Sequence, residues 1–326
     1  MSPYEVVLRN GREIDPVLWD AFIGQSPEGA VFHLHGYASI IAAGWEAVIV
    51  KRGEEWEAVL PFLRSSRMGF SRSLQPRFAQ YWGPCMAPSS LSGYEGLSRK
   101  KALQELLIEH LPPLKQIIWQ FSPMVDYPLP WYWQRFTLRT RYTFQLDLSQ
   151  TEPHLLSQTA STLRRYLKKG KTLLFEEEND PEALVQLLKK QQQEGHEIIG
   201  SNDLDWVTFP ALVRYLQEKG MGRMRVVKNG EGQVLSAGLF VRYGKLGMYL
   251  IGTYDPELGD RSAMPILLWK SICEDQAAGM RKFDFEGSMI PGVERFFRRL
   301  GGQPVAYLQV ERNDLPLVIQ WIHALR

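Results

Sequence analysis

Two carboxylates near the end of an apolar strand are the residues of this sequence best suited to proton transfer. In Lys282–Glu286, Phe283 and Phe285 alternate with Asp284 and Glu286, so the two carboxylates share one face of the strand. Ligands of α/β sheets bind at the carboxyl ends of strands. A carboxylate whose pKa is raised by burial can take a proton from an ammonium group there. We predict that Asp284 and Glu286 are catalytic; the alternative is that Asp284 caps a backbone group or pairs with an arginine.

Two tyrosines flank the end of the strand expected over 246–251. A tyrosine hydroxyl can donate a hydrogen bond to a developing oxyanion or protonate a leaving group. We predict a catalytic role for Tyr249 and a substrate-binding role for Tyr254. Packing in a core is the alternative for both, because a buried tyrosine gives the same sequence pattern.

A loop ahead of an apolar helix could hold the phosphates of a cofactor. Gly259, Arg261 and Ser262 directly precede the helix expected over 263–278. Backbone N–H groups at the start of a helix favour anions, and a glycine-containing loop can form a nest for one. We predict that these three residues bind the cofactor.

A run of basic residues opens the second half of the chain, with five cations within Arg164–Lys171. On a helix, Arg164, Arg165 and Lys168 lie on one broad face. Such a face can hold phosphate groups, bidentately where the cation is arginine, so we predict that these three residues bind substrate. A solvated helix face is the alternative, because charge runs commonly have that role.

An aromatic segment of the first half, residues 78–84, has the pattern of a strand end that faces a cleft. We predict that Gln80 and Tyr81 bind the acceptor substrate; packing between the two halves explains the segment equally well. No metal is expected, because His33 and His35 lack further ligands nearby and two cysteines cannot build a zinc site.

Size and composition indicate a globular protein of two domains. The chain has 326 residues, above the roughly 250–300 at which a single core stops growing. Its formal net charge of +2 is too small to indicate a DNA partner. No stretch reaches the roughly 18 apolar residues of a spanning helix, and the first residues lack the pattern of a secretory signal. We expect a cytoplasmic protein without a membrane span.

The elements that must position these residues follow from apolar periodicity and from glycine stops. In the second half the pattern predicts helices over 181–195 and 210–219, three antiparallel strands over 223–227, 234–241 and 246–251, a helix over 263–278, a strand over 282–285, a helix over 292–300 and a strand over 304–310. In the first half it predicts strands over 46–50 and 56–63, a helix over 98–111, and strands over 117–121 and 142–148.

The order of elements predicts an α/β protein with a mixed sheet, because a helix that crosses between neighbouring strands makes those strands parallel. Strands, a helix and a further strand recur at comparable places in both halves. We therefore predict two tandem domains, at residues 1–150 and 151–326, related by an old duplication. Two unrelated α+β domains are the alternative.

Three motifs of the second half resemble the Fem-type branch of the GNAT acetyltransferase superfamily, to which BioF2-like acetyltransferase-domain proteins also belong. They are the aspartate-containing segment 283–288, the helix 296–302 with its Phe-Phe-Arg-Arg-Leu-Gly-Gly sequence, and the basic helix 163–171. The resemblance covers about Ser161–Val310. It implies two tandem GNAT-like domains, the first degenerate, and an enzyme that transfers an acyl group to an amine.

The resemblance also implies the substrates. The leading hypothesis is an N-acyltransferase that uses acyl-CoA as co-substrate, with no tightly bound cofactor, and acylates a small amine or a precursor of the cell envelope such as one of peptidoglycan. A Fem-type aminoacyltransferase that uses aminoacyl-tRNA is the second hypothesis, and a non-catalytic binding protein on the same fold is the third.

Two departures from the family pattern bear on the donor. The segment Gly252–Ala263 lacks the Arg/Gln-x-x-Gly-x-Gly/Ala spacing with which acetyltransferases hold the pyrophosphate of coenzyme A. Phe297 stands where Fem-type aminoacyltransferases carry a lysine expected to assist the tRNA end. The first departure weakens the expectation of acyl-CoA, and the second weakens that of aminoacyl-tRNA.

Overall fold

The computed structural model of the chain describes residues 3–193, 206–287 and 289–316. The chain divides into two compact units. The first takes in Met1–Arg141 together with the chain from Ala306 on, and the second is Tyr142–Val305. This division differs from the predicted boundary at residues 150 and 151, because the strand before that boundary begins in the first unit and the last strand returns to it.

The first unit contains a four-stranded antiparallel sheet in the order β1-β2-β3-β6. Its strands are β1 (Glu5–Asn10), β2 (Glu46–Arg52), β3 (Glu55–Phe62) and β6 (Cys85–Met86), and its helices are α1 (Pro16–Gln25), α2 (His35–Ile41), α3 (Gly93–Glu109) and α4 (Leu129–Trp133), with short 3-10 turns at Gly11–Glu13 and Val31–His33. Beside it, β4 (Ser65–Arg67) pairs with β5 (Phe70–Leu74), and β5 pairs in parallel with β7 (Gln116–Gln120).

The second unit is built on six neighbouring strands of a ten-stranded mixed sheet, in the order β8-β13-β12-β11-β10-β9. They are β8 (Thr137–Asp147), β9 (Leu174–Glu177), β10 (Gly222–Lys228), β11 (Val234–Tyr243), β12 (Leu246–Tyr254) and β13 (Lys282–Asp284). Only the β12–β13 pair is parallel, and the other neighbours are antiparallel. The last strand, β14 (Gln303–Asn313), starts in this unit and pairs with β7 of the first.

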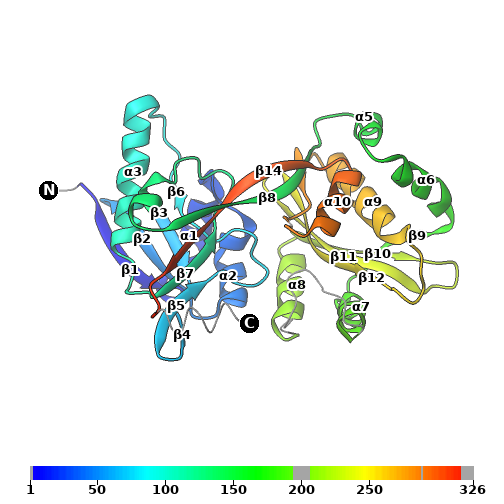
Figure 1. The fold of residues 1–326 in the computed structure, drawn as a ribbon, viewed down its shortest axis with the longest axis horizontal. Coiled ribbons are helices and arrows are strands. Elements are labelled where there is room, and N and C mark those ends of the chain that lie inside the picture. Colours follow the sequence, from blue (N-terminus) through cyan, green and yellow to red (C-terminus); the bar gives the residue numbers. More distant parts are fainter. Residues whose placement is uncertain (1–2, 194–205, 288, 317–326) are drawn as a thin grey trace. The chain divides into compact units, whose positions relative to one another are not determined.

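Helices cover both faces of this sheet (Figure 1). In that view α9 (Ala263–Ala277) and α10 (Pro291–Arg299) lie above the strands, and α7 (Glu182–Gln193) and α8 (Thr208–Glu218) lie below them. Between β8 and β9 the chain forms α5 (Glu152–Ser157), α6 (Ser161–Lys169) and the 3-10 turn Gly170–Thr172. The core lies between α9 and the sheet and includes Trp269, Phe283, Phe285 and Phe297. Burial of such large apolar side chains is the main stabilising contribution.

The α/β class with a mixed sheet is confirmed, and α9 and β10–β13 lie close to their predicted ranges. Several predictions are wrong in detail. The first-half helix begins at Gly93 rather than residue 98, β9 was not predicted, and residues 78–84 form an irregular loop between β5 and β6 rather than a strand end. Residues 194 and 195 of the helix predicted over 181–195 lie outside the described residues. Among the described residues, no helix is long and apolar enough to cross a bilayer.

Candidate functional site

The parallel strands β12 and β13 separate after only three paired residues, and a cavity opens between them. The pairs are Leu246 with Lys282, Gly247 with Phe283 and Met248 with Asp284. Beyond them β12 continues to Tyr254, while β13 ends at Asp284. The resulting cavity, here named the inner cavity, has a volume of about 500 Å³ and is lined by Gln191, Tyr249–Tyr254, Met264, Phe285–Gly287, Gly292, Val293, Phe296 and Phe297.

A β-bulge in β12 lies beside this cavity. Leu239 pairs with Ile251 and Phe240 pairs with Tyr249, so Leu250 has no opposite residue on β11. A bulge re-aims neighbouring side chains and is common next to active sites. The absence of a side chain at Gly252 is required here, because a Cβ at that position would lie 2.8 Å from the Tyr249 hydroxyl oxygen.

The Tyr249 ring packs between aromatic neighbours and carries its hydroxyl to the inner cavity. Its centroid lies 5.6 Å from that of Phe240 and 6.4 Å from that of Phe297. Burial, and after it the charge of Glu286, raises the pKa of Tyr249 above its usual range. The hydroxyl therefore keeps its proton at neutral pH and can donate it.

Glu286 is the carboxylate that reaches the inner cavity. Its backbone has a φ of +57°, a left-handed conformation that is unfavourable for a residue with a side chain and is common at functional sites. Within the described part of the chain, its buried Oε1 has no hydrogen-bond partner. Burial, and after it the charge of Asp284, raises the pKa of Glu286 well above its ordinary value. A carboxylate in this state is suited to accept a proton from a substrate.

Asp284 is completely buried and does not line the described cavities. Its Oδ1 accepts hydrogen bonds from the Thr143 hydroxyl at 2.5 Å and from the Glu286 backbone N–H at 2.8 Å, and its Oδ2 accepts one from the Gln145 amide at 2.8 Å. The two carboxylates predicted to act together therefore lie in different surroundings. Glu286 faces the cavity, whereas Asp284 is bonded into the sheet.

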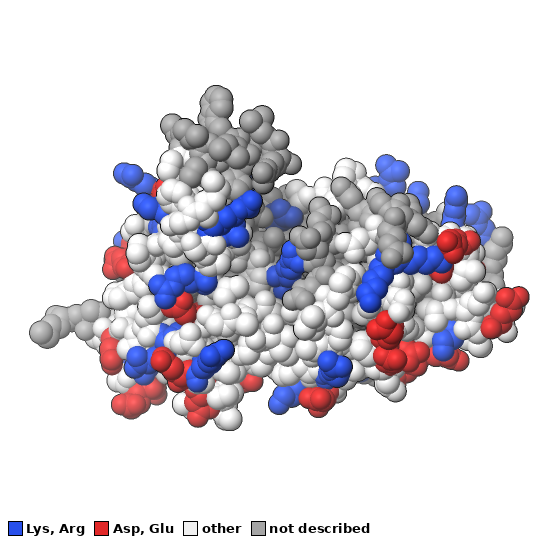
Figure 2. Space-filling model, turned by 90° about the horizontal axis from the view of Figure 1, so that it is seen from below, with Lys and Arg blue, Asp and Glu red and all other residues white. Residues whose placement is uncertain are grey.

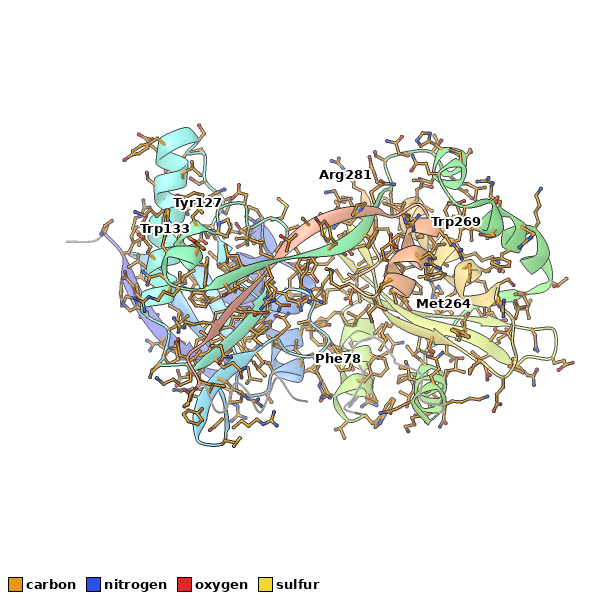
Figure 3. The ribbon with its side chains drawn as sticks, viewed as in Figure 1. Phe78, Tyr127, Trp133, Met264, Trp269 and Arg281 are labelled. Atoms are coloured by element: carbon orange, nitrogen blue, oxygen red, sulfur yellow. The ribbon has the colours of Figure 1, made fainter. Side chains whose placement is uncertain are left out.

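A second cavity adjoins the first. It is named the outer cavity, has a volume of about 710 Å³, and shares Tyr254, Met264 and Phe296 with the inner one. Its remaining lining residues are Thr162, Leu163, Tyr166, Pro256, Gly259, Asp260, Arg261, Pro265, Arg299 and Leu300. Met264 reaches it from the first turn of α9, whereas Trp269 farther along that helix is buried in the core (Figure 3).

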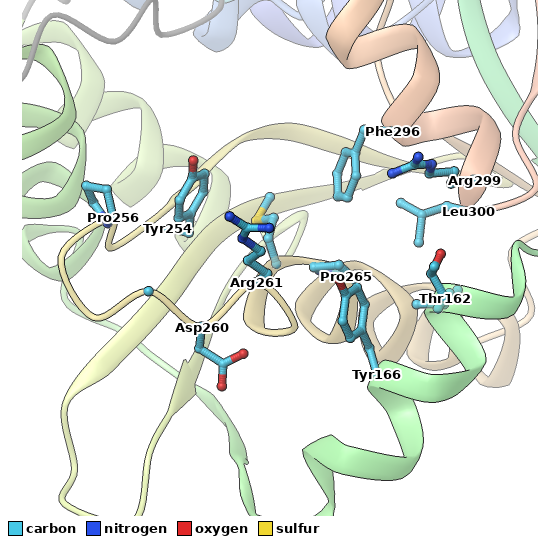
Figure 4. Close-up of a pocket in the computed structure, with 13 residues that line it drawn as sticks. Thr162, Tyr166, Tyr254, Pro256, Asp260, Arg261, Pro265, Phe296, Arg299 and Leu300 are labelled. Carbon is cyan, nitrogen blue, oxygen red and sulfur yellow. The ribbon is translucent and has the colours of Figure 1, made fainter.

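Two arginines bring positive charge to the outer cavity. Figure 4 shows Arg261 ahead of α9 and Arg299 at the end of α10, with the Phe296 ring drawn between their guanidinium groups. Both side chains are exposed, and among the described residues neither has an ion-pair partner. The cavity thus combines aromatic surface with two arginines that form no ion pair within the described part of the chain, a combination suited to phosphorylated ligands.

The predicted cofactor-binding residues lie together. Gly259, Arg261 and Ser262 line a shallow cavity of about 480 Å³. It shares four lining residues with the outer cavity: Tyr166, Gly259, Asp260 and Arg261. However, the carboxylate of Asp260 occupies the start of α9. Its Oδ1 accepts hydrogen bonds from the Ser262 backbone N–H at 2.8 Å and from the Ser262 hydroxyl at 2.6 Å. The backbone N–H of Ser262 is thus already bonded inside the chain.

The predicted basic face of α6 is directed away from the described cavities. Arg164 donates hydrogen bonds to the Thr159 carbonyl oxygen at 2.6 Å and to that of Leu156 at 3.4 Å. Arg165 and Lys168 are exposed and line none of these cavities. The residues of α6 that do line the outer cavity are Thr162, Leu163 and Tyr166.

Gln80 and Tyr81 belong to the first unit and line none of the described cavities. Both are buried, and the Tyr81 ring packs edge-on against Phe32 and Tyr307. Tyr254, by contrast, lies on both cavities of the second unit, as its predicted role requires.

Among the cavity residues that sequence reasoning missed are Gln191, Phe296 and Arg299. The spacing of Phe296 and Arg299, three residues apart on one helix, could have indicated that they share a face. Gln191 follows a run of lysines on α7, and no local signal distinguishes it from a solvent-exposed residue.

The described residues contain no group of three or more histidine, cysteine, aspartate or glutamate side chains that could hold a metal ion. On the face shown in Figure 2, basic and acidic side chains both occur over the surface. The distribution agrees with the small net charge of the chain.

The comparison with protein families identifies the second half. Residues 157–298 match the family model described as an acetyltransferase (GNAT) domain. These residues are a GNAT domain. Both cavities are built mainly from this GNAT domain, whose β12 and β13 part to form the inner one. No curated protein matches the sequence.

Solved structures extend the likeness to the whole chain. A structure titled FemX has a TM-score of 0.68 at 14% identity and covers 93% of this chain and 96% of its own. L-PGS from Bacillus licheniformis has a TM-score of 0.56 at 14% identity, with coverages of 94% and 95%. A tandem GNAT protein from the clavulanic acid biosynthesis pathway has a TM-score of 0.54 at 11% identity, with coverages of 96% and 99%.

At these identities the structural likenesses show the fold, which this chain shares with FemX and with the tandem GNAT protein. The predicted resemblance and the predicted fold are confirmed. The match of residues 157–298 to an acetyltransferase (GNAT) domain supports the predicted acyltransferase.

Proposed function

We propose that the GNAT domain transfers an acyl group from acyl-CoA to the amine of a small molecule or of a cell-envelope precursor, and that Glu286 accepts the proton. The observation that carries this proposal is the parting of β12 and β13 around a buried carboxylate oxygen that has no hydrogen-bond partner among the described residues. The gap between the strands is suited to a narrow donor chain. The remaining groups of the site then have defined roles.

In the proposed reaction the substrate ammonium first loses a proton to Glu286, directly or through water. The amine nitrogen then attacks the thioester carbonyl carbon, the C–S bond breaks, and an amide forms. The leaving thiolate takes a proton from the Tyr249 hydroxyl, which regains one from the attacking nitrogen. General acid–base groups of this kind typically contribute about 10²–10⁴-fold to the rate.

The outer cavity supports the binding of the donor. We propose that Arg261 and Arg299 bind the donor's phosphates and that Tyr166 and Phe296 contact its nucleoside. The arginine side chains would then hold the pyrophosphate that backbone N–H groups hold in other members of the superfamily. We further propose that residues 1–150 form a degenerate GNAT-like domain.

A second candidate, transfer from aminoacyl-tRNA, is favoured by one observation. Asp260 places a carboxylate at the start of α9, in the lining of the outer cavity, where it would repel the diphosphate of coenzyme A. The likeness in fold to FemX agrees with this candidate. An aminoacyl ester would react in the inner cavity with the same proton transfers.

Titration calorimetry with acetyl-CoA and filter binding with charged tRNA at varied salt separate the two donors. Saturable binding of acetyl-CoA that is weakened by Arg261→Ala supports the first, and binding of charged tRNA alone supports the second. Release of free thiol in the presence of a panel of amines, abolished by Glu286→Gln, tests catalysis. Binding of neither donor would contradict both candidates and leave a non-catalytic binding protein.

A further inference from the structure

The carboxylate of Asp284 is bonded to the one backbone group that determines how Glu286 is presented. Its Oδ1 lies 2.8 Å from the backbone nitrogen of Glu286, two residues ahead in the chain. That bond closes a tight turn, and within it Glu286 has its positive φ of +57°. Without an acceptor there, this backbone N–H would lose the hydrogen bond that closes the turn, and the left-handed conformation would lose its support.

Asp284 is itself anchored on the neighbouring strand. β8 pairs antiparallel with β13, and Gln145 stands directly opposite Asp284. The Gln145 amide donates to Oδ2 at 2.8 Å, and the Thr143 hydroxyl, two residues back on β8, donates to Oδ1 at 2.5 Å. Hydrogen bonds to a buried ionised acceptor are stronger than neutral ones, so β8 holds the Asp284 carboxylate in one orientation.

We infer that Asp284 is a positioning residue that, anchored by Thr143 and Gln145, holds Glu286 in its left-handed conformation with its carboxylate in the inner cavity. The inference rests on the proposed function, in which Glu286 is the proton acceptor, and adds the side chains that place it. It gives β8 a part in the site although neither Thr143 nor Gln145 lines the described cavities.

The charges around Glu286 agree with this role. Asp284 on β13 is the negative neighbour whose charge, after burial, raises the pKa of the Glu286 carboxyl. From β12 the titratable group that faces it is Tyr249, whose pKa the Glu286 charge raises in turn. The other described residues around the inner cavity, from α7 and α10, are uncharged. Asp284 therefore acts on Glu286 both through a hydrogen bond and through its charge.

Asp284→Asn separates the two effects. The side-chain oxygen of the introduced asparagine keeps the hydrogen bonds from Thr143 and Glu286, and its amide can donate to Gln145 if the Gln145 amide turns over. The geometry is preserved and the charge is lost. Asp284→Ala removes both, and Thr143→Val removes one anchor with a side chain of the same shape.

The first readout needs no activity. In protein labelled with ¹³C at the glutamate carboxyl carbon, the Glu286 resonance is assigned by its loss in Glu286→Gln and titrated between pH 4 and 9. We expect its midpoint to move to lower pH in Asp284→Asn, and the resonance to shift and broaden in Asp284→Ala. A Glu286 titration and line shape unchanged in both variants would overturn the inference, whatever the enzyme assay shows.

The second readout is turnover of acetyl-CoA with the best amine of the panel. We expect the acid limb of the pH profile to move to lower pH in Asp284→Asn, with kcat at its plateau largely kept. In Asp284→Ala we expect kcat to fall by about a hundredfold, the effect of a misplaced group, with the KM for acetyl-CoA nearly unchanged. Thr143→Val should show an intermediate loss that Thr143→Ser, which keeps the hydroxyl, does not.

These results distinguish the two proposals. If Glu286→Gln is inactive while both Asp284 variants, shown to be folded by circular dichroism, match the wild type, the positioning role is wrong and the proposed function stands. If no donor and amine react, or if Glu286→Gln keeps full activity, the proposed function is wrong, and the titration of Glu286 still decides the role of Asp284.

Discussion

Replacing Glu286 by glutamine should remove activity and, at neutral pH, stabilise the protein. Burial raises the pKa of Glu286 well above its ordinary value of 4.5, so the fold favours the neutral form. The stability linked to this group is fully present below pH 4.5 and is lost as the pH rises through the folded-state pKa. Each unit of raised pKa corresponds to about 1.4 kcal/mol. Glutamine cannot ionise and avoids this loss.

The free energy of unfolding of wild type and Glu286→Gln should be measured in urea between pH 4 and 8. We expect the free energies of unfolding of the two proteins to differ least near pH 4. As the pH rises, we expect the variant to become more stable relative to the wild type. A difference of 1 kcal/mol corresponds to about 2–4 °C in Tm for a domain of this size. The test is how the difference in the free energy of unfolding changes with pH, and not its value at one pH. The glutamine amide is buried in the same surroundings as Oε1, and this burial adds a contribution that does not depend on pH.

The matched control is Glu294→Gln on α10. Its carboxylate forms a surface ion pair with Arg298 at 2.7 Å, and such an i,i+4 pair is worth about 0.3–0.5 kcal/mol. A difference between wild type and Glu286→Gln that stays constant from pH 4 to 8 would refute the assignment of Glu286 as a buried carboxyl group whose pKa the fold raises. The same result would remove the physical basis for its role as proton acceptor.

Two further predictions concern the outer cavity and the sheet. Arg261→Ala should raise the KM for acetyl-CoA about tenfold, because hydrogen bonds to charged groups are strong. Added salt should reduce the difference in KM between this variant and the wild type. The control, Arg165→Ala, should leave the KM unchanged. Gly247→Ala should destabilise the protein by about 1–3 kcal/mol in urea, because its Cβ would overlap the buried Asp275 carboxylate. Gly230→Ala, where an added Cβ meets no atom within 4 Å, should be neutral; equal effects of the two glycine variants would contradict this account.

Local patterns were sufficient for most elements of the second unit. The apolar run of α9 ends at Gly279, and the strands β10 to β12 are separated by short polar turns, so spacing along the chain alone predicts their type and order. The placing of two carboxylates at the end of β13 follows from the sequence as well. So does the resemblance to the Fem-type branch, because its motifs are contiguous segments.

Only the tertiary structure decided which carboxylate reaches the cavity. Strict alternation would put Asp284 and Glu286 on one face, but the left-handed backbone at Glu286 ends the strand there. The Asp284 carboxylate, which accepts the Glu286 backbone N–H in that turn, also accepts hydrogen bonds from Thr143 and Gln145, about 140 residues away in sequence. No local pattern contains this information.

The tertiary structure also decided which charged side chains line the outer cavity and which strands pair with each other. The sequence alone determined that basic residues are dense on α6 and at the end of α10, because density is a local property. The packing of α6 turns Thr162 and Tyr166 toward the outer cavity, while Arg299 reaches it from α10. Likewise β14 returns to pair with β7 of the first unit. Which face of a helix is buried and which strand a strand joins depend on contacts between distant segments, and these form only in the folded chain.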